Sequence, residues 1–123
     1  MATIDTVAGN ASGATNVTRT ELTGADGLLF KTGTLQRLVL ENTGSGTPTI
    51  NILGDAATTF SCGGLGDPVD VSGGFDVSLA ATGSAGDVQI IPLHTIAAYL
   101  SDSTNMPDVT GGTSDVVAYI IES

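Results

Sequence analysis

The stretch TLQRLVLENTGSGTPTINIL, residues 34–53, decides the fold because it holds two apolar runs joined by residues that favour a chain reversal. Side chains of an extended chain alternate between two faces, so Leu38 and Leu40 share one face of the first run. Ile50 and Ile52 share one face of the second run. The intervening NTGSGTP contains Asn, Gly and Ser, which adopt turn conformations at low cost. The stretch predicts a β-hairpin with one apolar face, which needs a second apolar layer to be stable in water.

The composition supports a small β-rich domain with a strongly acidic surface. The chain has 123 residues, which suits one domain, and its 17 Gly with no Trp favour short strands and tight turns. Its net charge of −10 would repel a phosphate backbone, so we expect no nucleic-acid partner. No segment approaches the roughly 20 apolar residues that span a bilayer, so we expect no membrane partner.

The first sixteen residues, MATIDTVAGNASGATN, differ from the rest in their weak apolar pattern. Ile4 and Val7 are too few to predict a core strand, so residues 1–16 are interpreted as a flexible or extended arm. Residues 17–123 are interpreted as a single β-sandwich domain. We expect the arm to be mobile alone and to become ordered on a partner, where Ile4 and Val7 would add an extended segment to a neighbouring sheet edge. Removing the arm should then leave the thermal stability of the sandwich nearly unchanged.

Several further segments alternate apolar and polar residues and are separated by Gly-rich turns, as in a sandwich. The predicted strands lie at residues 17–22, 58–62, 69–71, 75–79, 88–91 and 116–121, and a short apolar run lies at residues 28–30. The one helical pattern places Leu93, Ile96, Ala97 and Leu100 on one face. The sequence therefore predicts an all-β sandwich or jelly roll with one short α-helix near residues 93–100.

The strand predicted at residues 116–121, VVAYII, is apolar on both faces. Such a strand is either central in a packed sandwich or partly covered by a neighbouring subunit. Association would bury the surplus face, so we expect a homo-oligomer. On this reasoning the candidate partner-binding residues are Val117, Tyr119 and Ile121, together with Ile4 and Val7 of the arm.

Catalytic equipment is sparse. His94 is the single histidine and Cys62 the single cysteine, so a catalytic pair would have to be made from these two. No Gly-x-Ser-x-Gly elbow is present. A surface or helix-cap role for His94, and a small buried thiol for Cys62, are the simpler interpretations. We therefore expect a protein that is not an enzyme and has no catalytic residues.

The acidic loops raise the question of a metal. The run GGLGD ending at Asp67 approaches the calcium-binding nonapeptide, but its Asp comes one position early and the unit does not repeat. Asp55, Asp67, Asp70 and Asp76 could gather around a divalent cation, since hard cations prefer several oxygen ligands. Solvated acidic loops are the simpler interpretation, so neither a metal site nor a cofactor is predicted.

Five segments resemble small structural proteins of tailed bacteriophages. They are TRTEL at residues 18–22, LVLENTGSGTPTINILGD, VDVSGG, IIPLHTIAAYL, and the closing strand that follows TGGT at residues 110–113. The proteins that they resemble are encoded beside the major capsid protein and include head decoration, or cement, proteins. The resemblance implies a β-rich protein on the virion that binds the outer capsid surface, often as a trimer, and stabilises the shell. It carries over no catalytic residues.

An extracellular β-sandwich module, such as a carbohydrate-binding or adhesin domain, is the alternative function. Sugar-binding modules usually present exposed Trp or Tyr for stacking. This chain has no Trp and two Tyr. The sequence therefore favours the capsid protein, with the major capsid protein as partner, over the sugar-binding module.

Overall fold

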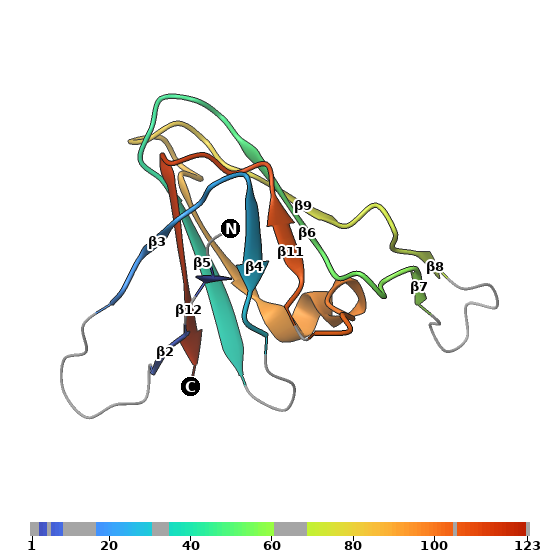
Figure 1. Cartoon of the computed structure of the whole chain (residues 1–123). Coiled ribbons are helices and arrows are strands. Elements are labelled where there is room, and N and C mark those ends of the chain that lie inside the picture. Colours follow the sequence, from blue (N-terminus) through green and yellow to red (C-terminus); the bar gives the residue numbers. More distant parts are fainter. Residues whose placement is uncertain are drawn as a thin grey trace.

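Two β-sheets packed face to face form the molecule, which confirms the predicted all-β sandwich (Figure 1). The computed structural model describes residues 3–4, 6–8, 17–30, 35–60, 69–104 and 106–122. Sheet A contains, in spatial order, β1 (Thr3–Ile4), β4 (Ala25–Leu28), β11 (Asp108–Thr110), β6 (Thr49–Leu53) and β9 (Phe75–Ser78). Sheet B contains β10 (Val88–Pro92), β5 (Gln36–Asn42), β12 (Val116–Glu122) and β2 (Thr6–Ala8), with β3 (Thr20–Glu21) also paired to β12. A separate ribbon joins β7 (Thr59–Phe60) to β8 (Val69–Asp70).

The predicted hairpin is wrong, although its apolar face is right. β5 belongs to sheet B and β6 to sheet A, so the chain crosses between the layers at residues 43–48 instead of pairing the two arms. Asn, Gly and Ser allow the chain to reverse either within one sheet or from one sheet to the other. Six residues readily span the roughly 10 Å between packed sheets. The side chain of Asn42 holds this crossover: Nδ2 donates to the carbonyls of Gly46 at 2.8 Å and Ala80 at 2.9 Å, and Oδ1 accepts from Gly44 N–H at 3.0 Å.

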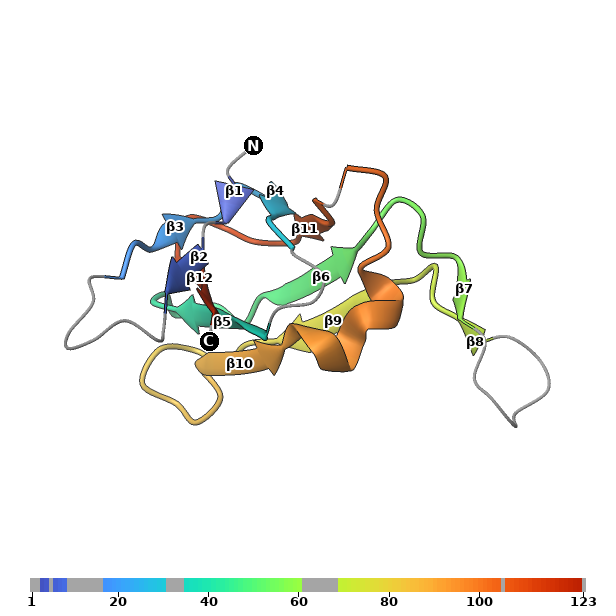
Figure 2. The same cartoon turned by 90° about the horizontal axis from the view of Figure 1, so that it is seen from below.

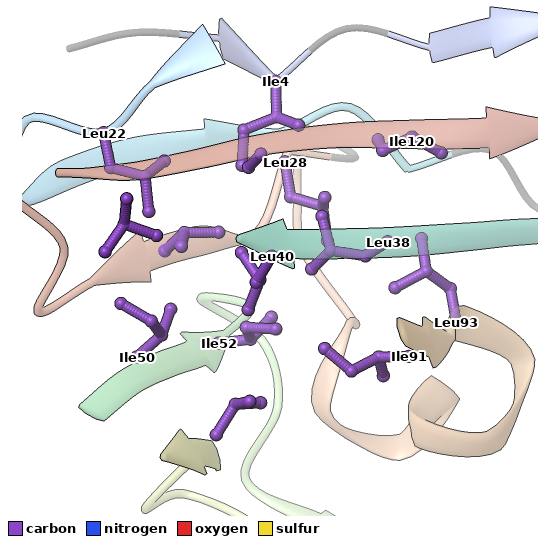
Figure 3. Close-up of a cluster of buried hydrophobic side chains, with 14 of the residues drawn as sticks. Ile4, Leu22, Leu28, Leu38, Leu40, Ile50, Ile52, Ile91, Leu93 and Ile120 are labelled. Atoms are coloured by element: carbon purple, nitrogen blue, oxygen red, sulfur yellow. The ribbon is translucent and has the colours of Figure 1, made fainter. Parts of the chain in front are cut away.

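The core lies between the sheets, where the predicted apolar faces of both runs meet. Leu38 and Leu40 of sheet B and Ile50 and Ile52 of sheet A are all fully buried (Figure 3). Neighbouring strands complete the cluster with Leu22, Leu28, Val77, Leu79, Ile91, Val109, Val116, Ala118 and Ile120. Burial of this aliphatic cluster is the main stabilising term of a chain whose one cysteine cannot form an internal disulfide.

The expectation that Ile4 lies outside the core is wrong. Its side chain is 0% exposed and belongs to the core cluster. β1 pairs in parallel with β4, and β2 pairs in parallel with β12, so residues 3–4 belong to sheet A and residues 6–8 to sheet B (Figure 2). Strands of two and three residues are too short to show an alternating pattern. The strands that they pair with also lie far away in the sequence. Removing the first eight residues would therefore open the core. A domain boundary at residue 16 does not separate an arm from the sandwich, because β1 and β2 belong to its sheets. Residues 9–16 lie outside the described part of the chain.

The predicted helix is present, but it is a 3-10 helix. η1 (Leu93–Tyr99) begins directly after Pro92 and has a kink at Ile96, where φ is −116° and ψ is 24°. The kink divides the segment into two short helical pieces, and 3-10 winding is used mostly in pieces this short. Leu93, Ile96 and Leu100 of the predicted apolar face are buried and cover the core. Ala97 is exposed, so its place on that face was predicted wrongly.

Candidate functional site

The strand that the sequence shows as apolar on both faces is central in sheet B. β12 pairs with β5 on one side and with β2 and β3 on the other. Val116, Ala118 and Ile120 point into the core and are 0% exposed. The alternate residues Val117, Tyr119 and Ile121 are half-buried on the opposite face of the sheet. The central position explains one apolar face, and the other apolar face remains in contact with solvent.

Neighbouring strands extend this outer face into an apolar surface. The register places Tyr119 opposite Val39 of β5, and Val39 opposite Ile90 of β10. Ile90 is 58% exposed and Val88 is 45% exposed, whereas Val39, between its two neighbours, is only 2% exposed. We call this surface the sheet B stripe and define it as Val39, Val88, Ile90, Val117, Tyr119 and Ile121.

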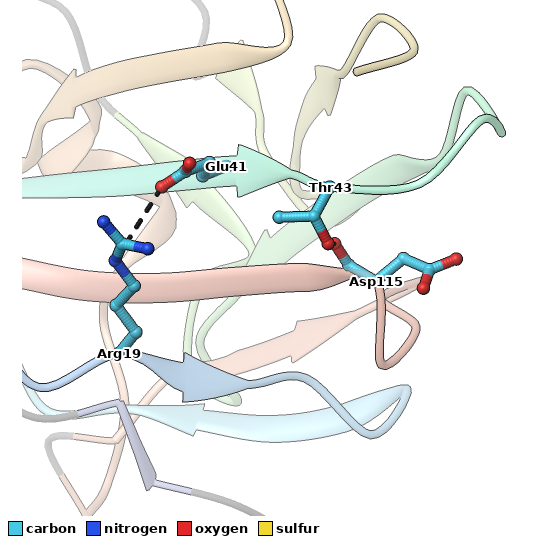
Figure 4. Close-up of polar contacts among 4 residues, drawn as sticks. All are labelled: Arg19, Glu41, Thr43 and Asp115. Carbon is cyan, nitrogen blue, oxygen red and sulfur yellow. Dashed lines mark hydrogen bonds and ion pairs between the residues drawn. The ribbon is translucent and has the colours of Figure 1, made fainter. Parts of the chain in front are cut away.

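Charged side chains lie within and beside the stripe: Glu41 of β5 lies in register between Val88 and Val117. Arg37 lies in register between Pro92 and Ile121. Arg19 precedes β3, and its Nε lies 4.0 Å from Oε2 of Glu41 (Figure 4). An ion pair this long with an exposed guanidinium contributes at most a few tenths of a kcal/mol. Its relevance is its position: both arginines of the chain lie at the sheet that carries the stripe, where they offset the negative charge.

The end of the central strand pair is fixed by a side chain. Thr43 N–H and Thr43 Oγ1 both donate to the carbonyl oxygen of Asp115, at 2.8 and 2.7 Å (Figure 4). Asp115 precedes β12, and Thr43 follows β5. The two bonds hold β5 and β12 in register where the crossover begins.

The outer face of sheet A has the opposite chemistry. Asn51 Nδ2 donates to Asp76 Oδ1 at 2.8 Å and to the Gly73 carbonyl at 2.9 Å. The hydroxyls of Thr49 and Ser78 lie 3.4 Å apart on the same two strands. Sheet A thus presents hydrogen-bonded polar groups where sheet B presents aliphatic and aromatic groups.

A groove opens where the edge strands of the two sheets approach each other. β9 and β10 line it, with Phe75, Asp76, Gln89, Ile91 and Pro92 among the lining residues. Its volume is about 380 Å³. The ring of Phe75 also packs against Tyr99 of η1, with ring centroids 5.7 Å apart. The groove is therefore a mixed apolar and polar channel beside the stripe.

Carboxylates in the described loops fix the backbone instead of converging on a site. Asp102 accepts from the Thr104 hydroxyl at 2.6 Å and from Asp55 N–H at 2.9 Å. The Thr104 hydroxyl first, and then the Asp55 N–H, lower the pKa of Asp102 to about 2. Asp55 in turn accepts from Ser103 N–H and Oγ at 2.8 and 2.6 Å. These reciprocal bonds join the loop after β6 to the loop before β11.

Of the four aspartates considered for a cation, the three that the structure describes, Asp55, Asp70 and Asp76, do not converge on one site. Asp70 accepts from the hydroxyl and N–H of Ser72, which lower its pKa, and Asp76 accepts from Asn51. Asp67 lies outside the described residues. Within the described ranges no group of three or more His, Cys, Asp or Glu side chains is placed to hold a metal ion.

The remaining candidates of the sequence are dispersed. His94 is exposed on η1, and Cys62 lies outside the described part of the chain. Ile4 is fully buried and so cannot contact a partner in this fold. The main chain of Val7 pairs with Ile121, which places it at the border of the stripe, but its side chain lies outside what the structure describes.

Sequence reasoning identified the β12 part of the stripe and missed Val39, Val88 and Ile90. The run VQII does not reveal which of Ile90 and Ile91 faces the core, because either choice leaves one isoleucine outside. The register with β5 decides it. The exposed Ile90 falls beside Val39, and the buried Ile91 falls beside Leu38.

Comparison of the chain with protein-family models, curated proteins and solved structures gave no match. Among the described residues, no helix combines the length and apolar character needed to cross a bilayer.

Proposed function

We propose that this protein is a non-catalytic structural protein of a phage virion, a decoration or cement protein that binds the outside of the capsid through the sheet B stripe. The single observation that carries the proposal is this stripe, a group of apolar side chains on the outer face of β10, β5 and β12. A protein-binding surface usually has aliphatic and aromatic groups at its centre and charged groups at its rim. The resemblance to small phage head proteins supplies the partner, the major capsid protein.

The chemistry of the acidic groups supports a structural role. Asp55, Asp70, Asp76 and Asp102 each accept hydrogen bonds from nearby hydroxyl, amide or backbone N–H groups. A carboxylate used in this way stabilises a turn, and it is not held in a cleft beside a nucleophile. We expect the bound form to be an oligomer on the virion, with the trimer of the resembled proteins as the first arrangement to test.

The experiment uses particles of the phage that encodes the chain, assembled with the gene deleted. Purified protein is added back, and binding is measured by co-sedimentation and by a map of the particle. The expected result is saturable binding to the outer surface and an increase in the temperature at which the shell opens. Particles that do not bind the protein, or wild-type virions that do not contain it, would overturn the proposal.

The groove between β9 and β10 favours a second candidate, an extracellular binding module. Asp76 and Gln89 supply polar groups at its wall, and Phe75 supplies an aromatic ring. A sugar ligand would use such a combination of hydrogen bonds and stacking. Binding to a glycan array that is lost in Asp76→Ala, without binding to particles, would favour this module over the capsid protein.

A further inference from the structure

Strand β10 is one edge of sheet B, and the hydrogen-bond pattern shows which of its main-chain groups face outward. Asn42 N–H donates to the Asp87 carbonyl at 2.8 Å, which fixes these two residues as a hydrogen-bonded pair between β5 and the start of β10. Such pairs alternate along an antiparallel ladder. Gln89 and Ile91 therefore direct their main-chain groups toward β5, and the N–H and C=O groups of Val88 and Ile90 point away from the sheet.

Pro92 limits the length of this open edge. Its register partner is Arg37, which places Pro92 in the same phase as Val88 and Ile90. The missing N–H of proline therefore falls on the outward side, and the ladder with β5 loses nothing. The edge offers four main-chain groups, two donors and two acceptors, on two residues.

The corresponding edge of sheet A is protected, whereas no strand among the described residues covers the β10 edge of sheet B. Leu79 N–H donates to the Pro48 carbonyl at 3.0 Å. By the same alternation, the main-chain N–H and C=O groups of Asp76 and Ser78 on β9 point away from sheet A. A carboxylate on an edge strand opposes pairing with another strand. On β10 the outward residues are Val88 and Ile90, and Ile90 is the most exposed large hydrophobic residue in the described chain. An open aliphatic edge of this kind is a template for another strand.

We propose that β10 pairs antiparallel with β10 of a second copy of this chain, about a twofold axis that passes beside Gln89. In this register Val88 of one copy lies opposite Ile90 of the other, and both pairs are hydrogen-bonded. All four outward groups of each copy then find partners, and Pro92 lies beyond the paired residues. The inference goes beyond the proposed function, because the contact needs no capsid.

Two observations select a second copy as the occupant of the edge. The register is self-complementary, since it places an aliphatic side chain opposite an aliphatic side chain twice. The chain carries a net charge of −10, which opposes self-association over most of its surface, yet residues 88–101 contain no Asp, Glu, Lys or Arg. Two acidic copies can therefore approach along β10. The paired strands would also place the two sheet B stripes side by side on one face of the joined sheet.

Disulfide trapping tests the register directly. In a Cys62→Ser background, Gln89→Cys places two thiols at the axis in a non-hydrogen-bonded pair, where Cα atoms are about 4.5 Å apart. This separation is within the roughly 4.4–6.8 Å that a disulfide needs. Val88→Cys is the matched control, because the two copies of that position lie on a diagonal more than about 7 Å apart.

The expected result is that mild oxidation converts the Gln89→Cys variant to a covalent dimer and leaves the Val88→Cys variant monomeric. Equal cross-linking of both variants would indicate random collision and would overturn the register. Failure of both variants to cross-link would overturn the contact itself.

Sedimentation equilibrium of variants without introduced cysteines measures the dissociation constant of the dimer. Val88→Pro removes one outward N–H and no bond to β5, so it should weaken the dimer at least tenfold, whereas Val88→Thr keeps that N–H and should not. Ile90→Lys should weaken the dimer similarly. Val69→Lys introduces the same charge at a 43% exposed site on the separate ribbon and should leave the dimer intact. A wild-type protein that stays monomeric at high micromolar concentration, or self-association unaffected by Val88→Pro and Ile90→Lys, would overturn the proposal.

Discussion

The outer faces of sheets A and B are built on similar strands but differ in chemistry. On sheet A, Asn51 bonds to Asp76, and Thr49 lies beside Ser78. On sheet B, Tyr119, Val39 and Ile90 form an apolar row across three strands. Antiparallel sheets with one solvated face normally keep that face polar. The difference indicates that sheet A is complete in water, whereas sheet B carries a surface suited to a further protein layer.

The largest expected difference in stability between the two faces comes from placing one carboxylate on each of them. Val39→Asp puts a carboxylate between Ile90 and Tyr119 at a site that is 2% exposed, so the free energy of unfolding should fall by about 3 kcal/mol. Thr49→Asp, at an exposed site on sheet A, should change it by less than about 0.5 kcal/mol. Urea unfolding of both variants measures the difference. Equal losses would mean that the two outer faces are equally hydrated.

Binding to capsids should distinguish the faces by a smaller amount. Tyr119→Thr removes the one aromatic ring of the stripe, and truncating a central aromatic contact typically costs about 1–3 kcal/mol, which is roughly a ten- to hundredfold loss of affinity. Thr110→Ala on sheet A is the matched control and should bind as the wild type does. Co-sedimentation with particles that lack the protein measures both. Unchanged binding of the Tyr119→Thr variant would exclude the stripe as the capsid contact.

The polar face can be tested by removing its central amide. Asn51→Ala deletes the bonds to Asp76 and to the Gly73 carbonyl, and exposed hydrogen bonds of this kind are worth about 1 kcal/mol. Thermal unfolding should show that loss, while Thr47→Ala in the exposed crossover should show almost none. An Asn51→Ala variant as stable as the wild type would mean that these bonds on sheet A contribute nothing to stability.

Acid should have the smallest measurable effect, on the two bonded loops that follow β6 and precede β11 of sheet A. The folded-state pKa of Asp102, about 2, lies below its ordinary 3.8. Its ionised form therefore stabilises the fold above about pH 4, and that contribution is lost as the pH falls toward 2. Thr104→Ala removes the main donor and should move the pKa of Asp102 back toward 3.8 in a carboxyl NMR titration. Ser72→Ala removes the donor to Asp70 instead and should leave the pKa of Asp102 unchanged. An equal shift of the Asp102 pKa in both variants would contradict the assignment of Thr104 as its main donor.

Side-chain alternation predicts which way residues face, and it does not predict which strands pair. It placed Leu38, Leu40, Ile50 and Ile52 correctly in the core. The hairpin failed because the Asn and Gly chemistry of residues 42–47 serves a crossover between layers as well as a turn within one. Ile4 was predicted wrongly for a related reason: its strand pairs with β4, where its register partner Leu28 lies far away in the sequence.

The candidate site shows the same division. Val117, Tyr119 and Ile121 could be predicted because their strand has too many apolar residues for one face. Ile90 could not, since its exposure follows from the register with Val39 and not from its own neighbours in the sequence.

The pairing of β2 with β12 has a consequence for how the molecule is made. Thr6 pairs with Ile120, so one edge of sheet B joins two segments that are separated by most of the sequence. The central partner of β5 is also β12. On a ribosome, β5 would emerge long before the strand that completes its sheet, and folding would wait for β12. Pairings this distant in sequence fold slowly, in milliseconds to seconds, and until then the aliphatic strands depend on chaperones or on low concentration.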